Sequence, residues 1–101
     1  MAIEIQHQRE AVTERLKPPP LFKVILLNDD YTPMDFVANI LMQLFHKGCE
    51  EAEKIVLQIH QNGQGICGVY VHDIAETKQY QVMSTSREQG HPLKCIIETD
   101  R

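Results

Sequence analysis

The sequence lacks most features that mark secreted or membrane-spanning proteins. Its three cysteines, Cys49, Cys67 and Cys95, form no Cys-x-x-Cys pair and have no metal-ligand spacing. This odd, unpatterned set indicates reduced thiols in a cytoplasmic protein, and we expect all three to be buried apolar side chains. The N-terminus has no continuous apolar stretch like that of a signal peptide. No apolar run approaches the ~20 residues that a membrane span needs.

Basic charge is also scarce. The chain has 10 Lys and Arg against 14 Asp and Glu, a formal net charge of −4, and no local basic block. We therefore expect neither nucleic acid nor a membrane as partner. The sequence also has no glycine-rich phosphate loop. We expect no cofactor, no resident metal and no catalytic residues, so that the protein is not an enzyme.

What is present is enough for one small folded domain. The chain has 101 residues, and its 43% hydrophobic content is ordinary for a globular protein. Residues 1–20 are polar with scattered aliphatic side chains and end in three consecutive prolines, which favour a stiff, extended spacer. The sequence thus predicts a flexible N-terminal extension over 1–20 and a core domain over 21–101.

Apolar periodicity predicts an α+β fold in the order β-α-α-β-α-β. The expected strands are residues 21–27, 66–71 and 93–98, and the expected helices are residues 33–47, about 50–60 and about 73–89. The first two helices show apolar residues at i, i+3, i+4 and i+7, which is typical of one buried face, and the third is expected to turn Ala75, Gln79 and Val82 inward. We therefore expect a three-stranded antiparallel sheet packed against three helices.

Capping signals predict where the helices begin and end. Thr32 is expected to cap the first helix together with Asp35, and Gly48 is expected to end it. Asp73 followed by Glu76 resembles a second capping box at the start of the third helix. Gly90 is expected to end that helix.

A polar cluster interrupts the apolar pattern where the first strand gives way to a helix. Asn28, Asp29 and Asp30 are ordinary turn formers, but a turn needs one or two such residues rather than three. His60 lies at the end of the second predicted helix, where a histidine alone would be a C-terminal helix cation. If the two segments meet, their acceptors suit a metal ion or an ammonium group.

Apolar side chains flank this cluster on the two predicted helix faces. Met34 and Val37 come from the first helix, and Val56 and Ile59 come from the second. Such residues at helical spacing usually form core. Together with the polar cluster, they suit a guest that carries an amine beside an apolar side chain. The N-terminal residue of a peptide is such a guest.

Four segments of the sequence resemble the ClpS family of adaptor proteins for the ATP-dependent Clp protease. They are PPPLFKVILLNDDYTPMDFV, EEAEKIVLQIHQNGQGICGVY, IAETK and HPLKC, and they span about residues 18–98 in the family's order and spacing. The resemblance implies a βααβαβ sandwich. It also implies an adaptor that binds N-degrons, peptides that begin with Leu, Phe, Tyr or Trp, and delivers them to the ClpA unfoldase for degradation by ClpP.

The resemblance assigns expected roles to individual residues. The α-amine of the peptide would be held by Asn28, Asp30 and His60. Asp29 would shape the turn, and Thr32 would line the entrance. The hydrophobic pocket would be formed by Met34, Val37, Val56, Ile59 and Leu93.

A second expected surface concerns the ATPase partner. The resemblance implies that the start of the third helix docks on the N-terminal domain of ClpA or a related unfoldase, through Asp73, Glu76, Thr77 and Lys78. Without the resemblance, a capped, solvated helix start is the simpler interpretation of these residues. The family also implies that residues 1–20 engage the unfoldase during delivery, and that the protein is a monomer.

One residue departs from the family pattern inside the expected pocket. Many members have Met where this chain has Val56, and Val is shorter and stiffer. We therefore expect a roomier pocket that is more favourable to Trp or more tolerant of β-branched first residues. Asp73 is a smaller departure, because some relatives have Glu there.

Two other functions remain open at this point. A metal-dependent phosphoesterase would use Asp29, Asp30 and His60 around a divalent cation, since hard cations prefer oxygen ligands. However, adjacent carboxylates on an extended segment point apart. A modulator that binds the ATPase and has no peptide pocket is the other alternative.

Overall fold

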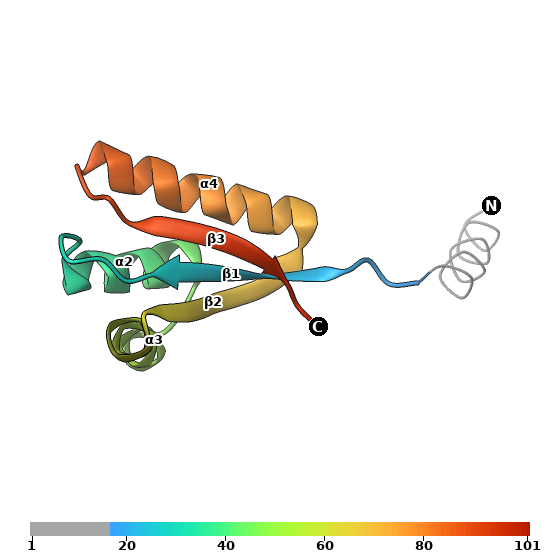
Figure 1. The fold of residues 1–101 in the computed structure, drawn as a ribbon, viewed down its shortest axis with the longest axis horizontal. Helices are drawn as coiled ribbons and strands as arrows, with labels where there is room; N and C mark the ends of the chain where they lie inside the picture. Colours follow the sequence, from blue (N-terminus) through green and yellow to red (C-terminus); the bar gives the residue numbers. More distant parts are fainter. Residues whose placement is uncertain (1–16) are drawn as a thin grey trace.

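The predicted order of elements is confirmed in the computed structural model, which describes residues 17–101. The strands are β1 (Leu21–Leu27), β2 (Gln64–Val71) and β3 (Lys94–Thr99). The helices are α2 (Met34–Leu44), α3 (Cys49–Asn62) and α4 (His72–Glu88). Figure 1 shows α4 lying lengthwise along the sheet, with α3 beside β2. The predicted extension lies outside the described residues except for 17–20, which are exposed and form no helix or strand.

The three strands form an antiparallel sheet in the order β2-β1-β3, as the sequence predicted. Leu27, the last residue of β1, lies opposite Gln64 on one side and Lys94 on the other. The register of β1 and β2 shifts between Val24 and Ile25, where Cys67 is the extra residue. The end of β1 is therefore held between the start of β2 and the start of β3.

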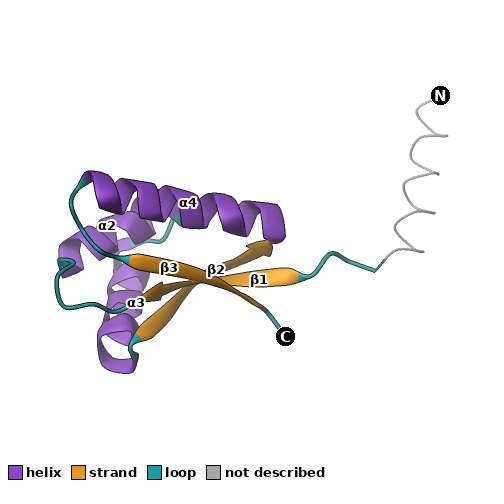
Figure 2. Ribbon diagram, turned by 45° about the horizontal axis from the view of Figure 1, so that its top comes forward, coloured by secondary structure: helices purple, strands orange, loops and turns teal. Residues whose placement is uncertain are grey.

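The core lies between the sheet and the three helices, which occupy the same side of it (Figure 2). Val24 and Leu26 of the central strand are fully buried and pack with apolar residues from all three helices. Ile25 points to the other face, where its strand neighbours are Ile66 and Ile96. The two faces follow from the period-2 alternation of a strand.

The predicted capping box at the first helix is wrong. α2 begins at Met34, and Pro33 holds the N-cap position without any side-chain hydrogen bond to the helix. The Thr32 hydroxyl donates instead to the Asp29 carboxylate at 2.7 Å. Thr32 bonds to Asp29 rather than to the helix, because the preceding carboxylate competes for the same hydroxyl and this bond completes a tight turn.

The predicted end of that helix at Gly48 is also wrong. α2 ends at Leu44, and it is His46 that takes a left-handed conformation, with φ of 55°. Gly48 is the N-cap of α3, and its carbonyl accepts from the Ala52 amide at 2.9 Å. A left-handed histidine is uncommon, so the sequence offered only the glycine as a stop signal.

The third helix differs from prediction at its start and agrees at its end. α4 begins at His72 directly from the last residue of β2, and no side chain caps it, so Asp73 lies in the first turn rather than at the cap. Gly90, with φ of 76°, follows the helix. The amides of Gly90 and His91 donate to the carbonyls of Arg87 and Ser86, which is a Schellman ending.

The three cysteines are free, but they are not all buried as predicted. Cys67 and Cys95 are buried, whereas Cys49 is exposed at the first position of α3. Burial raises the pKa of both the Cys67 and the Cys95 thiol to about 12, with a further contribution to Cys67 from its neighbour Cys95. Among the described helices, none is both long enough and apolar enough to cross a bilayer.

Candidate functional site

Two backbone hydrogen bonds bring the polar cluster to the end of α3. The Asn28 amide donates to the Gly63 carbonyl at 2.9 Å, and the Gly63 amide donates to the Ile59 carbonyl at 2.9 Å. Gly63 takes a left-handed conformation with φ of 86°, which reverses the chain after the helix. The last turn of α3, which carries His60, therefore lies beside the first residue after β1.

A small cavity lies at this junction. Its free volume is about 20 Å³, which is room for about one water molecule. Its lining residues are Leu27, Asn28, Asp29, Thr32, Met34, Val37, Val56, Ile59, His60 and Leu93. The structure thus brings all five predicted pocket residues to one place, together with four of the five predicted polar residues.

The apolar part of this cavity is continuous with the core. Val37, Val56, Ile59 and Leu93 are each at most 8% exposed. Met34 differs because its side chain is 49% exposed and stands at the rim. An unbranched thioether at the rim can change rotamer without disturbing the packed residues below it. The cavity therefore has a rigid floor and a movable edge.

Asp29 forms the turn that shapes the rim. Its carboxylate accepts from the Tyr31 amide at 2.8 Å, the Thr32 amide at 2.7 Å and the Thr32 hydroxyl at 2.7 Å. Partial burial raises the pKa of Asp29, but these three hydrogen bonds outweigh burial and hold its pKa below the ordinary value. Asp29 is thus an ionised side chain that already accepts three hydrogen bonds inside the protein, of the roughly four that a carboxylate can accept.

The three predicted amine ligands are in a different state from Asp29. Asn28, Asp30 and His60 are exposed, and none of their side chains forms a hydrogen bond or ion pair with another residue that the structure describes. Asn28 and His60 line the cavity, whereas Asp30 does not. Asp30 lines a neighbouring groove that shares Asn28 and Asp29 with the cavity.

Sequence reasoning missed one lining residue. Leu27 lines the cavity and is the last residue of β1. It was assigned only to the strand, yet a residue where an apolar strand meets a polar cluster lies between core and rim by position. This boundary was visible in the sequence and could have identified Leu27.

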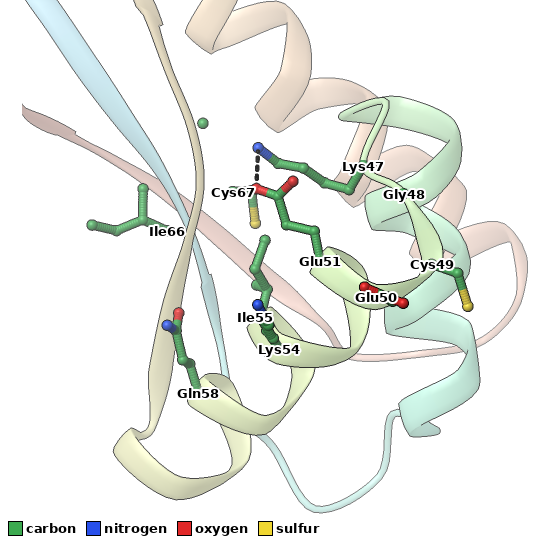
Figure 3. Close-up of a pocket in the computed structure, with 11 residues that line it drawn as sticks. Lys47, Gly48, Cys49, Glu50, Glu51, Lys54, Ile55, Gln58, Ile66 and Cys67 are labelled. Carbon is green, nitrogen blue, oxygen red and sulfur yellow. Dashed lines mark ion pairs between the residues drawn. The ribbon is translucent and has the colours of Figure 1, made fainter.

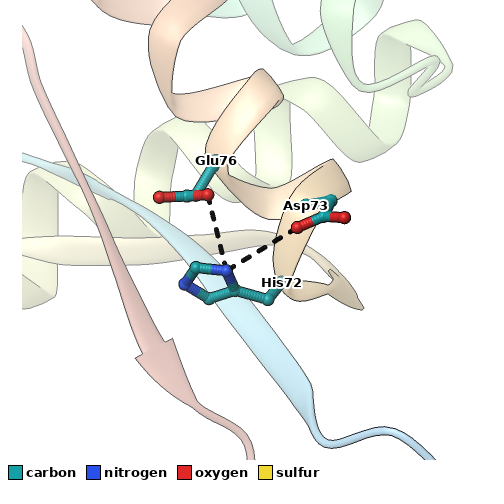
Figure 4. A group of neighbouring side chains, drawn as sticks. All are labelled: His72, Asp73 and Glu76. Atoms are coloured by element: carbon teal, nitrogen blue, oxygen red, sulfur yellow. Dashed lines mark ion pairs between the residues drawn. The ribbon is translucent and has the colours of Figure 1, made fainter.

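The predicted docking face also contains a histidine that the sequence did not single out. His72 Nδ1 lies 3.4 Å from Glu76 Oε1 and 4.0 Å from Asp73 Oδ1 (Figure 4). All three residues are exposed at the start of α4. The Thr77 hydroxyl donates to the Asp73 carbonyl at 3.0 Å. The first turn of α4 thus carries one polar surface, which is formed by His72, Asp73 and Glu76.

Lys78, the fourth predicted docking residue, faces the protein rather than solvent. Its ammonium donates to the Leu44 carbonyl at 2.6 Å and lies 5.8 Å and 5.9 Å from the ring centres of Phe45 and Tyr70. This carbonyl lies at the end of α2, where no backbone amide of the helix is available to donate a hydrogen bond to it. Lys78 therefore ties α4 to α2.

A larger hollow lies beside the first turns of α3, about 810 Å³ in volume and open to solvent. It is lined by the loop into α3, by Lys54, Ile55 and Gln58, and by β2 from Ile66 to Gly68 (Figure 3). Lys47 and Glu51 form an ion pair of 3.5 Å at its edge. None of its lining residues lines the small cavity, and no predicted site residue contributes to it.

Potential metal ligands do not gather where the phosphoesterase alternative needs them. Within residues 17–101, the group of His, Cys, Asp or Glu side chains close enough to share an ion is His72, Asp73 and Glu76, all exposed. Asp29, Asp30 and His60 form no such group, and the Asp29 carboxylate is already bonded within the turn. The cavity instead combines hydrogen-bond acceptors with an apolar floor.

Comparison with known proteins places this geometry in a family. A family model described as "ATP-dependent Clp protease adaptor protein ClpS" matches residues 17–96. The chain belongs to the ClpS family. It is therefore an adaptor of the ATP-dependent Clp protease, which confirms the resemblance seen in the sequence.

Individual relatives agree over almost the whole chain. The ClpS protein of Nitrosospira multiformis is 53% identical over 89 residues, 88% of this chain and 87% of the relative. That of Paraburkholderia phymatum is 51% identical over 102 aligned residues, 97% of this chain and 98% of the relative. The solved structure of Agrobacterium tumefaciens ClpS2 bound to L-phenylalaninamide matches with a TM-score of 0.80 and 36% identity, over 82% of this chain and 100% of that chain.

Proposed function

We propose that this adaptor binds N-degrons, peptides with a free α-amine and a large apolar first residue, at the cavity between β1 and α3. Asn28, Asp30 and His60 receive the ammonium, and the apolar floor receives the side chain. The observation that carries the proposal is the junction itself: unpartnered acceptors stand at the mouth of a cavity whose floor is fully apolar.

The acceptors match the ammonium in number and type. An ammonium has three donors and no acceptor, so an amide oxygen, a carboxylate and a neutral imidazole nitrogen satisfy it fully. Hydrogen bonds that involve a charged partner contribute about 1.5–3 kcal/mol each. Acetylation of the amine removes both the charge and two of the donors, so an acetylated peptide should bind far more weakly.

The apolar floor supplies the second part of the affinity. Burial of a Leu or Phe side chain contributes roughly 1.5–3 kcal/mol, whereas micromolar binding needs about 8 kcal/mol. The side chain alone is therefore insufficient, and three charge-assisted hydrogen bonds reach this value only at the upper end of their range. Because the cavity of about 20 Å³ is smaller than such a side chain, the half-exposed Met34 at the rim swings aside as the guest enters.

A solved relative supports this choice of ligand. Agrobacterium tumefaciens ClpS2 is bound to L-phenylalaninamide, a molecule with a free α-amine and an aromatic side chain. Its structure covers 82% of this chain. The same two chemical groups are those that the cavity of this chain is proposed to hold.

Delivery of the bound substrate completes the proposal. The surface of His72, Asp73 and Glu76 docks on the N-terminal domain of a ClpA-type unfoldase, which passes the substrate to ClpP. Residues 1–20 engage the unfoldase, and the adaptor acts as a cytoplasmic monomer without catalytic activity. Lys78 supports this surface by fixing α4 rather than by touching the partner.

The test is fluorescence anisotropy with three labelled peptides of otherwise identical sequence: one begins with Phe, one with N-acetyl-Phe and one with Ser. We expect the free-amine Phe peptide to bind at least about ten-fold more tightly than either of the others, since each loses one half of the interaction. Asn28→Ala should abolish the difference. Gln58→Ala, on the exposed side of α3, is the matched control.

Equal binding of all three peptides would contradict the proposal. If none bound while the protein still associated with the unfoldase domain, the alternative of an ATPase-binding modulator would replace it.

A further inference from the structure

The polar surface at the start of α4 brings together one nitrogen and two oxygen atoms of the kinds that bind metal ions. His72 Nδ1 lies 3.4 Å from Glu76 Oε1 and 4.0 Å from Asp73 Oδ1, and the three ligand atoms all lie within 4.8 Å of one another. Positions i and i+4 share one face of a helix. His72 and Glu76 are therefore neighbours whenever α4 is formed.

The imidazole of His72 is oriented by a contact with the sheet. Its ring meets the Phe22 ring edge to face, with the ring centroids 4.8 Å apart and the planes at 69°. Phe22 belongs to β1 and packs against the core. Figure 4 shows that both carboxylates approach the same nitrogen of the ring, Nδ1. A ligand that is already oriented loses less conformational freedom on binding than a mobile one.

The charges around these atoms favour a cation. Within the described part of the chain, Asp73 and Glu76 form ion pairs with His72 alone, because Lys78 donates to the Leu44 carbonyl instead. When the lone pair of a neutral imidazole faces two carboxylates, three acceptors converge, and a cation satisfies all of them. The positive end of the α4 dipole opposes a cation, but it amounts to about half a unit charge against two carboxylates.

The distances and ligand types fit a small transition-metal ion. Zn²⁺ binds imidazole nitrogen and carboxylate oxygen at about 2.0–2.2 Å in tetrahedral geometry, which separates neighbouring ligand atoms by roughly 3.4 Å. The distance from His72 Nδ1 to Glu76 Oε1 already has this value, and the freely exposed Asp73 carboxylate can rotate inward to match it. Calcium needs six to eight oxygen ligands, whereas an imidazole ligand suits zinc, copper and nickel.

We propose that His72, Asp73 and Glu76 form a surface site for a divalent transition-metal ion such as Zn²⁺, with the fourth ligand position open to water. The site stands on its own geometry and does not involve the peptide cavity. Its consequence for delivery rests on the proposed function. Because the same carboxylates face the unfoldase, a bound ion withdraws them, and the metal and the unfoldase domain compete for the adaptor.

The test is isothermal titration calorimetry of the metal-free full chain with Zn²⁺ and, separately, with Mg²⁺. We expect Zn²⁺ alone to bind, and its affinity to fall at least about ten-fold in His72→Ala and in Glu76→Gln, since even residues that only support a ligand contribute this much. Glu76→Gln keeps the size of the side chain and the contact between His72 and Phe22, so misfolding does not explain its effect.

Cys49→Ser is the matched control. It removes an exposed thiol, another zinc ligand, from the first position of α3, and should leave the affinity for Zn²⁺ unchanged. Wild-type affinity in both His72→Ala and Glu76→Gln would overturn the site. A loss confined to Cys49→Ser would also overturn it, because the ion would then bind at α3.

A second measurement tests the competition, with labelled adaptor and the N-terminal domain of a ClpA-type unfoldase. The Zn²⁺ concentration that halves docking should match the dissociation constant measured on the adaptor alone, and EDTA should restore docking. If Zn²⁺ binds the adaptor but docking is unchanged, the competition is wrong and the metal site stands. If the domain does not dock even with EDTA, the proposed delivery step is wrong, and calorimetry still decides the metal site.

Discussion

At the scale of single residues, the polar cluster divides into two kinds of side chain. Asp29 accepts three hydrogen bonds from its own turn, whereas the exposed side chains of Asn28 and Asp30 form no hydrogen bond with another residue that the structure describes. The same carboxylate chemistry therefore serves structure at one position and, in our proposal, ligand binding at the next. The hydrogen bonds of Asp29 keep the rim in shape before any peptide arrives.

The lowered pKa of Asp29 predicts how this turn responds to acid. Its pKa in the folded protein lies below the ordinary 3.8, so its contribution to stability is present above that value and disappears as pH falls through the folded pKa. The free energy of unfolding of wild type should exceed that of Asp29→Asn at pH 6, and the gap should shrink below about pH 4. Urea denaturation at several pH values measures it, and a constant gap would contradict the role of the carboxylate.

Val56 gives a prediction for the shape of the cavity floor. Met is longer and fills more space than Val, so Val56→Met should narrow the cavity. We expect peptides that begin with Trp or Ile to lose about five-fold or more in affinity relative to a Leu peptide, since a mismatch of one methylene in an apolar pocket changes binding by roughly 1–3 kcal/mol. Anisotropy with Leu, Phe, Trp and Ile peptides checks the ranking. An unchanged ranking would show that Val56 does not set specificity.

At the scale of elements, the site depends on how closely α3 lies against β2. The two elements meet at Gly65, whose position would place a Cβ atom 2.8 Å from Ile59 Cγ1 and 3.3 Å from Ile55 Cγ2. Only glycine leaves room for this contact. Ile59 and Val56 share that helix, so the same packing sets the cavity floor.

Gly65→Ala should therefore affect both stability and binding. Overpacking of a filled core costs typically 1–3 kcal/mol, and relief of the clash would push α3 and His60 away from β1. We expect a lower urea midpoint together with weaker binding of a Phe peptide. Gly48→Ser is the matched control, because nothing lies within 4 Å of an added Cβ there and Ser is a good N-cap. Equal effects of both substitutions would contradict the packing argument.

Lys78 connects a second pair of elements. Loss of its hydrogen bond to the Leu44 carbonyl should destabilise the fold, because a bond from a charged donor contributes about 1.5–3 kcal/mol. Lys78→Met keeps most of the apolar stem and should lower the free energy of unfolding by about that amount. Lys54→Met, on the exposed face of α3, should change it by less than about 0.5 kcal/mol. If Lys78→Met weakens binding to the unfoldase without loss of stability, Lys78 contacts the partner directly.

At the scale of the whole molecule, one core is shared by all six elements. Apart from Ile25 on the other face of the sheet, the buried apolar residues form a single cluster that includes Cys67 of β2 and Cys95 of β3, on either side of the central strand. Neither thiol can react until the sheet separates from the helices. The thiols are therefore reporters of global unfolding.

Thiol labelling tests this arrangement. At pH 8, Ellman's reagent should modify one equivalent rapidly, at the exposed Cys49. Cys67 and Cys95 should react only at the rate of unfolding, because both are buried and their pKa is about 12. The variant Cys49→Ser should show no rapid phase. A second rapid equivalent in wild-type protein would show that part of the core opens locally.

Much of this architecture was determined by the sequence alone. The order of the elements, the buried faces of the helices and the stop at Gly90 follow from periodicity and from local backbone preference, which involve residues close together in the chain. The wrong predictions concern Thr32, Gly48 and Asp73, where two local partners competed or where a strand ran directly into a helix. Cys49 was also misplaced, since its exposure depends on where α3 begins.

Contacts between residues that are distant in the chain depend on the tertiary structure and could not be predicted from local sequence patterns. Asn28 and His60 line the same cavity because the Asn28 amide bonds to the carbonyl of Gly63, and Leu93 lines it because β3 pairs with β1. Lys78 turns inward because α2 ends beneath it with a carbonyl unpaired. The groove beside the cavity likewise exists because residues 28–31 and 92–94 are brought to the same end of the sheet. Such contacts join residues distant in the chain, and their partners are fixed by the packing of the whole core rather than by any local pattern.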